Sequence, residues 1–225
     1  MKAIRFVAAA AALTLAQGAV AATLLNDDFS GDAPALSVTS LANFSVAGTV
    51  DVVGANNPYG IVTSKNVVDL DGTPGPGALT SNSFAFGKSS RVTLTFVLGG
   101  AQRGSIADQF KAGFTFGDTI RIKHYTLGGS FGAVDDGTYD VSSIANFATI
   151  AGAAPFQTYS LSFISTSANS LRINIGTDSA DNIGPLLSNV RLDVAAVPEP
   201  ASWALMIAGF ALVGVAARRR RFAAA

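Results

Sequence analysis

Apolar and polar residues alternate with a period of two in five segments of the chain. The apolar members are Val92, Leu94, Phe96 and Leu98; Ile120 and Ile122; Leu161 and Phe163; Leu171, Ile173 and Ile175; and Val190, Leu192 and Val194. Such a segment forms a strand with one apolar face, as in an antiparallel sheet that covers a core on one side. Weaker strands are predicted at residues 44–53, 66–70 and 78–86.

Turn-forming residues separate these strands. Residues 71–77 read Asp-Gly-Thr-Pro-Gly-Pro-Gly, a sequence that fits neither a helix nor a central strand. Gly128-Gly129 and Asp136-Gly137 are further breaks, and between the two tails a helix of one or two turns is expected only at residues 141–150. Short strands joined by glycine-rich turns predict an all-β fold, an antiparallel β-sandwich that resembles a jelly roll.

The composition excludes several classes of protein. The 225 residues include 15 basic residues (lysine or arginine) and 15 acidic residues (aspartate or glutamate), so the net charge is zero. A polybasic nucleic-acid binder is therefore excluded. The absence of cysteine excludes disulfide scaffolds, thiol nucleophiles and cysteine-based zinc sites. A single histidine, His124, excludes a multi-histidine metal centre.

Charge divides the chain into three parts. Residues 22–197 contain 14 aspartates and nine lysines or arginines, which gives this body a net charge of −5, whereas the remaining basic residues lie in the two tails. The predicted parts are a signal peptide at 1–21, a β-sandwich ectodomain at 22–196 and a C-terminal segment at 197–222.

The N-terminal segment reads as a secretory signal. Lys2 and Arg5 precede an apolar stretch at residues 6–16, which is too short to span a bilayer, and Ala19-Val20-Ala21 has the small residues of a cleavage site. This pattern predicts an N-terminal signal helix, export through the Sec translocon, and removal of the helix by signal peptidase.

The C-terminal segment reads as a short membrane anchor. Residues 201–217 carry no charge, and as a helix they would span about 26 Å, close to the hydrocarbon thickness of about 30 Å. Arg218, Arg219, Arg220 and Arg221 follow, and arginine clusters stay on the cytoplasmic side, so the body is expected outside the inner membrane. Trp203 would lie at the outer interface.

A proline-glutamate-proline triplet, Pro198-Glu199-Pro200, stands directly before this apolar run. The triplet, the short helix and the terminal arginines together resemble the PEP-CTERM sorting signal of Gram-negative bacteria. The resemblance implies that Pro198, Glu199 and Pro200 are recognised by an exosortase, a membrane-embedded enzyme that cuts near the triplet and passes the protein to the cell surface or the extracellular matrix.

The body has a weaker family resemblance. The stretches at residues 68–86, 91–104 and 184–200 are similar to galactose-binding-like and DUF642-like jelly rolls that precede such signals. These domains open with a strand like Asn26-Asp27-Asp28-Phe29 and close with an Asp-Asn-Val strand, in which Ser188 replaces the aspartate here. That departure leaves an acidic ligand at the closing strand without support.

The residues offer little for catalysis. The body contains no glutamate, the pairs Asp27-Asp28 and Asp135-Asp136 lie beside turn residues, and His124 lies in a basic strand without a nucleophile elbow. We therefore expect no enzymatic activity and no catalytic residue, with a secreted hydrolase as the least favoured alternative.

Two binding sites remain open from the sequence. Asp69 and Asp71 beside a glycine-rich loop, together with Asp178 and Asp181, form a candidate calcium site, although structural turns explain them as well. Asn56, Asn57 and Tyr59 place two amides beside a ring, a candidate contact for exopolysaccharide. The primary interpretation is a non-enzymatic protein of the cell surface or matrix, and the alternative is a carbohydrate-binding module that binds exopolysaccharide with or without calcium.

Overall fold

The computed structural model describes residues 21–104, 107–116, 119–121, 148–165, 167–177, 179, 181–197 and 206–214. This part of the chain forms thirteen strands and one short helix at 206–214. The strands are β1 (Ala22–Asp27), β2 (Ala35–Ser40), β3 (Phe44–Val53), β4 (Val67–Asp69), β5 (Ala78–Ser81), β6 (Phe84–Phe86), β7 (Ser90–Gly99), β8 (Ala107–Phe116), β9 (Thr119–Arg121), β10 (Ala148–Ala151), β11 (Gln157–Ile164), β12 (Asn169–Gly176) and β13 (Leu186–Ala196).

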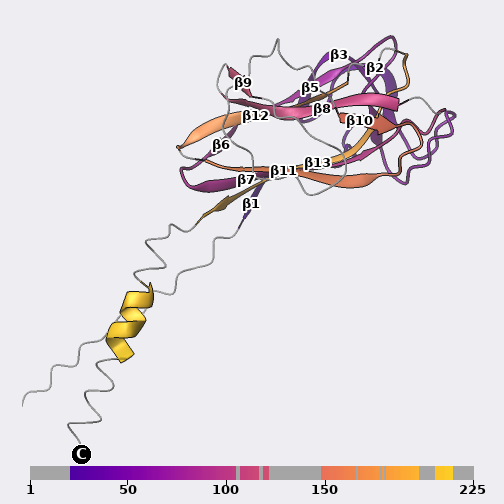
Figure 1. Cartoon of the computed structure of the whole chain (residues 1–225). Helices are drawn as coiled ribbons and strands as arrows, with labels where there is room; N and C mark the ends of the chain where they lie inside the picture. Colours follow the sequence, from indigo (N-terminus) through magenta and orange to yellow (C-terminus); the bar gives the residue numbers. More distant parts are fainter. Residues whose placement is uncertain are drawn as a thin grey trace, which may run out of the picture.

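The strands lie in two layers, as Figure 1 shows. One layer has the order β10-β8-β12-β5-β3, with β9, β6 and β2 at its margins, and the other has the order β13-β7-β11, with β1 beside β13. Short β4 pairs with β3 of the first layer and with β13 of the second, which links the two layers. The described pairs are antiparallel, so the expected antiparallel β-sandwich is confirmed.

The core fills the space between the layers. β7 lies between β11 and β13, and Leu94 faces Leu161 on one side and Leu192 on the other. All three leucines are at most 1% exposed. β7 buries Val92, Leu94, Phe96 and Leu98 while the residues between them are partly exposed, so the predicted period of two is confirmed there. Burying each such side chain stabilises the fold by roughly 1.5–3 kcal/mol.

Other predicted strands differ in detail. Segment 44–53 coincides with β3, segment 66–70 contains β4, and segment 78–86 is divided between β5 and β6. The expected helical turn at 141–150 is wrong for its described part, because residues 148–150 belong to β10 and pair with β8. Neither β2 nor β8 was predicted.

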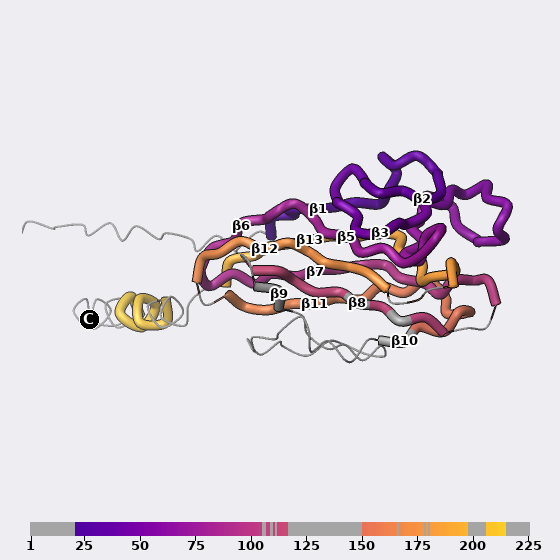
Figure 2. Tube along the Cα trace, turned by 90° about the horizontal axis from the view of Figure 1, so that it is seen from above, coloured from indigo at the N-terminus to yellow at the C-terminus, as the bar shows by residue number. Residues whose placement is uncertain are grey.

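Both ends of the body meet at one end of the sandwich. Ala22, the first residue of β1, lies opposite Val194 near the end of β13, and Figure 1 shows β1 and β13 leaving the sandwich together. Figure 2 shows that the strands of both layers run lengthwise, so this end is far from the loop between β3 and β4. Residues 1–20 lie outside the described part, and the signal helix stays a prediction.

The helix at 206–214 covers part of the expected anchor at 201–217. Its apolar side chains are exposed, with Ile207 and Leu212 at 66% and 71%. Over the residues that the structure describes, we find no helix that combines the length and the apolar character needed to cross a membrane. The transmembrane helix therefore stays a prediction, and residues 201–205 and 215–217 lie outside the described part.

Candidate functional site

The described structure leads directly to the proline-glutamate-proline triplet. Ala196, the last residue of β13, lies opposite Ser90 at the start of β7. The N–H of the next residue, Val197, donates a 2.7 Å hydrogen bond to the carbonyl of Ser89. Pro198, Glu199 and Pro200 follow at once, and they lie outside the described residues, as do Trp203 and Arg218–Arg221.

Ser165 stabilises the turn at residues 87–90, in which the carbonyl of Ser89 accepts the hydrogen bond from Val197. Its Oγ donates to the carbonyl of Gly87 at 2.6 Å and accepts from the N–H of Ser90 at 2.9 Å. Its backbone exchanges two further hydrogen bonds with Ser89 and Ser90. Since Ser165 is only 6% exposed, this network is shielded from water and fixes the position of Ser89.

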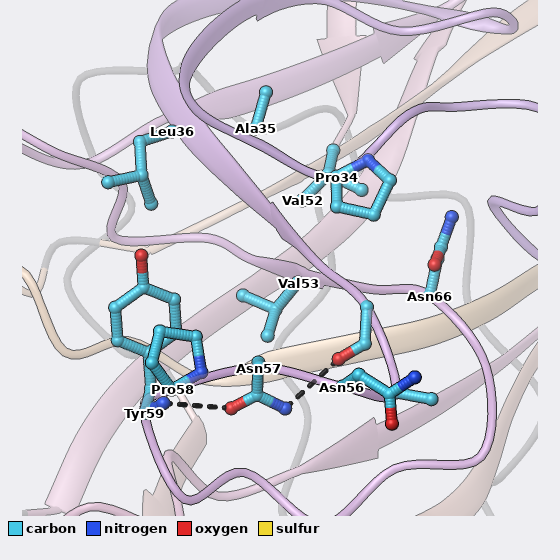
Figure 3. A pocket seen from close by; sticks show the side chains of 12 residues that line it. Pro34, Ala35, Leu36, Val52, Val53, Asn56, Asn57, Pro58, Tyr59 and Asn66 are labelled. Carbon is cyan, nitrogen blue, oxygen red and sulfur yellow. Dashed lines mark hydrogen bonds between the residues drawn. The ribbon is translucent and has the colours of Figure 1, made fainter.

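A groove of about 370 Å³ lies at the opposite end of the sandwich, beside the loop between β3 and β4. Its walls are apolar, with Pro34, Leu36, Val52, Val53 and Pro58, and its polar groups are the amides of Asn56, Asn57 and Asn66 and the ring of Tyr59 (Figure 3). Leu36 and Tyr59 are 49% and 39% exposed. The groove thus brings together the three residues that the sequence suggested for carbohydrate.

Asn57 has a structural role in this groove. Its Nδ2 donates to the carbonyls of Gly54 and Ile61 at 3.0 and 2.8 Å, and its Oδ1 accepts from the N–H groups of Tyr59 and Ile61, both at 3.1 Å. The side chain therefore shapes the loop and has little bonding capacity left for a sugar. Asn56 and Tyr59, which are exposed, are the better candidate contacts.

Arg103 connects the groove with a group of buried carboxylates. Its Cζ lies 5.7 Å from the ring centroid of Tyr59, and its Nη2 forms an ion pair with Asp69 Oδ2. A guanidinium at this distance from a ring contributes a cation–π attraction. This role of Arg103 could not be predicted from the sequence, because nothing local in residues 101–104 indicates a partner 34 positions away.

Asp69 and Asp71 hold the loop at 181–184. Asp69 Oδ1 accepts from the N–H groups of Asp71 and Gly184 at 3.1 and 2.9 Å. Asp71 Oδ2 accepts from the N–H groups of Asp181 and Asn182, both at 2.9 Å. Both aspartates are fully buried, so these hydrogen bonds offset the cost of removing the carboxylates from water. From the sequence, both a calcium site and structural turns were open for Asp69 and Asp71. The contacts observed here are those of structural turns.

Asp108 is a further carboxylate at this place, and the sequence did not predict it. It is 2% exposed, and Ser179 Oγ lies 3.0 Å from its Oδ1. Asp108 Oδ2 and Asp71 Oδ1 are buried and find no hydrogen-bond partner among the residues that the structure describes. The pKa of Asp108 is raised to about 6, mainly by burial and also by the nearby charges of Asp181 and Asp71, while the hydrogen bond from Ser179 acts in the opposite direction.

Burial also raises the pKa of Asp69 to about 7, although Arg103 and the N–H groups of Gly184 and Asp71 act in the opposite direction. In the part of the chain that is described, no group of three or more carboxylate or imidazole side chains is arranged to hold a metal ion. Asp178, the fourth residue of the candidate calcium site, lies outside that part. A calcium ion stays a prediction.

The residues weighed for catalysis fall into two groups. Asp27 is 6% exposed and accepts from the N–H of Phe29 and from Asn43 Nδ2, at 2.8 and 3.1 Å. Asp28 Oδ1 accepts from the N–H of Ser30 at 3.1 Å. These contacts stabilise the turn after β1, as expected of aspartates beside turn residues. His124, Asp135 and Asp136 lie outside the described residues.

Residues 196–221 match the PEP-CTERM protein-sorting motif. The sequence-based identification of the C-terminal segment is therefore confirmed, and the match begins at the last residue of β13. Such a motif implies export and sorting to the surface in bacteria, with processing by an exosortase. No curated protein matches the chain.

Several solved structures are similar to the body. The CBM22-1 xylan-binding domain from Paenibacillus barcinonensis is 12% identical, with 79% of this chain and 97% of that chain covered and a TM-score of 0.45. A cyclase from Fischerella sp. TAU is 14% identical, with 80% and 100% covered and a TM-score of 0.49. The K3 cleaved adhesin domain of Lys-gingipain from Porphyromonas gingivalis is 16% identical, with 77% and 99% covered and a TM-score of 0.38. Similarity at this level carries no information about a ligand.

Proposed function

We propose that the chain is an exported, non-enzymatic protein of the cell surface or extracellular matrix, made as a membrane-anchored precursor. Residues 1–21 act as the signal peptide, 22–196 form the ectodomain, and an exosortase processes the segment at 197–222. The observation that carries this proposal is the motif match at 196–221, which begins where β13 ends.

The chemistry of the segment supports this order of events. Each proline of the triplet fixes φ, and Pro200 also biases Glu199 toward an extended backbone, which suits a substrate strand for a peptidase. Glu199 is the only glutamate of the chain and lies just outside the predicted membrane edge. Neither the fold nor an anchor needs a carboxylate there, so we assign it to recognition by the processing enzyme.

The test is a double substitution, Pro198→Ala with Glu199→Ala, in a host that contains an exosortase. We expect full-length protein to accumulate in the inner membrane, as measured by fractionation and immunoblotting. Pro155→Ala with Gln157→Ala is the matched control, because it removes an exposed proline and an exposed polar side chain from the body. If the triplet variant reaches the surface as the parent does, the segment is a plain membrane anchor.

Carbohydrate binding is the second candidate function, and the groove at Tyr59 is the observation that favours it. The exposed ring of Tyr59, the exposed amide of Asn56 and an apolar wall offer stacking and hydrogen bonds together, as sugar recognition needs. We propose exopolysaccharide as the ligand, with calcium as a structural ion near Asp71 and Asp108. A glycan array probed with and without a chelator tests both parts, and a blank array in both conditions rejects the binding function.

A further inference from the structure

Charge is distributed unevenly along the length of the sandwich. We call the end that carries Ala22, the 87–90 turn and Val197 the terminal end, and the end that carries the 54–66 loop the distal end. Eight of the nine aspartates that the structure describes lie at the distal end: Asp27, Asp28, Asp32, Asp51, Asp69, Asp71, Asp108 and Asp181. The ninth, Asp193, forms an ion pair with Arg191.

The terminal end has the opposite charge. Lys88 is exposed in the turn that accepts the hydrogen bond of Val197, and Arg91 is exposed one strand position from Ser90. Arg91 lies opposite Ala195 of β13 and Ile164 of β11, so its place at this end is fixed by two neighbouring strands. The exposed Arg172 of β12 lies three positions from Asn169, which is opposite Phe86 beside this turn, and the charge of Arg191 is paired with Asp193.

The connection from this end to the anchor is short. Val197 is held to Ser89, and the apolar run begins at residue 201. The three residues between them span about 10 Å when fully extended. An anchor embedded at 201–217 therefore keeps the terminal end about one headgroup layer from the hydrocarbon.

We propose that the terminal end of the sandwich rests on an anionic lipid surface in the anchored precursor, with Lys88 and Arg91 against the headgroups. This inference relies on the anchor of the proposed function. An anionic surface attracts each nearby lysine or arginine by about a fivefold factor in binding, and it repels the acidic distal end. Both effects favour the same orientation, which leaves the groove at Tyr59 facing away from the membrane.

The test uses the full chain, which contains no cysteine, so a single introduced cysteine can be labelled. Gly87→Cys places a fluorophore in the turn, where a Cβ would meet only Ser90 Oγ at 3.5 Å, and Val62→Cys places one at the distal end, on a side chain 80% exposed. The protein is reconstituted into vesicles of phosphatidylcholine with 30% phosphatidylglycerol and labelled with an impermeant maleimide, and lipids with a nitroxide headgroup quench a nearby probe.

We expect strong quenching at position 87 and little at position 62. Adding Lys88→Glu and Arg91→Glu to the Gly87→Cys chain should reduce the docked population at least about fivefold. The matched control is Lys65→Glu, an exposed distal charge, which should leave quenching unchanged. Salt at about 0.5 M should weaken the effect, because it screens exposed charges within a few ångströms.

Two results would overturn the inference: equal quenching at positions 87 and 62, or full quenching after both charge reversals. Extraction with alkaline carbonate separates this failure from that of the proposed function. If carbonate removes the chain from the vesicles, the anchor itself is absent. If the chain stays embedded and the probe at position 87 is not quenched, the anchor stands and the docked orientation is wrong.

Discussion

The N–H of Val197 lies 2.7 Å from the carbonyl oxygen of Ser89, and this hydrogen bond is the last one that the body makes before Pro198 among the described residues. Residues 190–196 are paired with β7 up to that point. A peptidase that binds an extended substrate on both sides of its cleavage site would compete for the same backbone groups. The fold and such an enzyme would therefore compete for the end of β13.

Extra residues between Val197 and Pro198 should relieve this competition. We expect an insertion of four Gly/Ser residues to increase the rate of processing several-fold, because the enzyme no longer has to break backbone hydrogen bonds worth about 1 kcal/mol each. Pulse-chase labelling measures the rate. The same insertion after Thr63, in an exposed loop, is the control. Slower processing would show instead that the enzyme measures distance from the folded body.

The mature protein should begin at Ala22 or Thr23. β1 begins at Ala22, so cleavage after Ala21 leaves a chain whose first residues already pair with Val194 and Asp193. Cleavage several residues later would remove part of β1 and expose the edge of β13. N-terminal sequencing of surface material checks this, and Met1 on that material would contradict the signal peptide.

The strands that the sequence predicted best are those whose polar face carries Thr, Ser, Arg or Asn. In β7, β12 and β13 these residues separate large buried ones, and the period of two is plain. In β8 the period of two is not apparent from the sequence. Its buried positions include the charged Asp108 and the small Ala112 as well as Phe110 and Phe114. β2 lies at a margin of its layer with exposed residues, so it has almost no apolar face to detect.

The candidate sites show a similar division. Asp69 and Asp71 could be recognised as turn carboxylates, but the loop that they hold comes from residues 110–115 positions further along the chain. Arg103 and Asp108 reach the same place from the end of β7 and the start of β8, with no local motif. Local patterns predict which residues bend the chain, whereas the packing of the two layers decides which of them meet.

Replacing Asp108 with Asn should change how stability depends on pH. The pKa of Asp108 is about 6 in the fold and 3.8 as the ordinary value, so the folded state binds more protons between these limits. The free energy of unfolding therefore decreases as pH rises through this window. The variant should lose this part of the decrease and be more stable than the parent at pH values above about 7.

Urea denaturation from about pH 4.5 to pH 8 measures the effect of Asp108→Asn. Asp28→Asn is the control, since the pKa of this exposed aspartate is lowered by hydrogen bonds to Ser30 and its loss should not reproduce the change. Repeating the series with calcium and with a chelator tests the ion. A bound calcium would stabilise the parent and not the variant, whereas identical pH profiles for both proteins would refute the role of Asp108.

Gly184→Ala should destabilise the fold. A Cβ at this position would lie 2.4 Å from the N of Asp71 and 2.6 Å from its Cβ, and the loop cannot retreat without losing its hydrogen bonds to Asp69 and Asp71. Overpacking of this kind costs about 1–3 kcal/mol. Thermal unfolding compares the variant with Gly31→Ala, whose Cβ would meet nothing within 4 Å. Equal melting temperatures would show that the loop is free to move.

Tyr59→Ala should reduce binding to exopolysaccharide while the fold is kept. The ring is 39% exposed at the rim of the groove, with the guanidinium of Arg103 at 5.7 Å, so its loss removes a stacking surface and no core packing. Stacking on one aromatic ring is worth about 1 kcal/mol, and we expect affinity to decrease about fivefold or more. Affinity electrophoresis in polysaccharide gels measures this, with circular dichroism to verify the fold.

Val62→Ala is the matched control, because it removes an exposed apolar side chain from the same loop but not from the groove lining. Undiminished binding by the Tyr59 variant would place the ligand elsewhere on the sandwich.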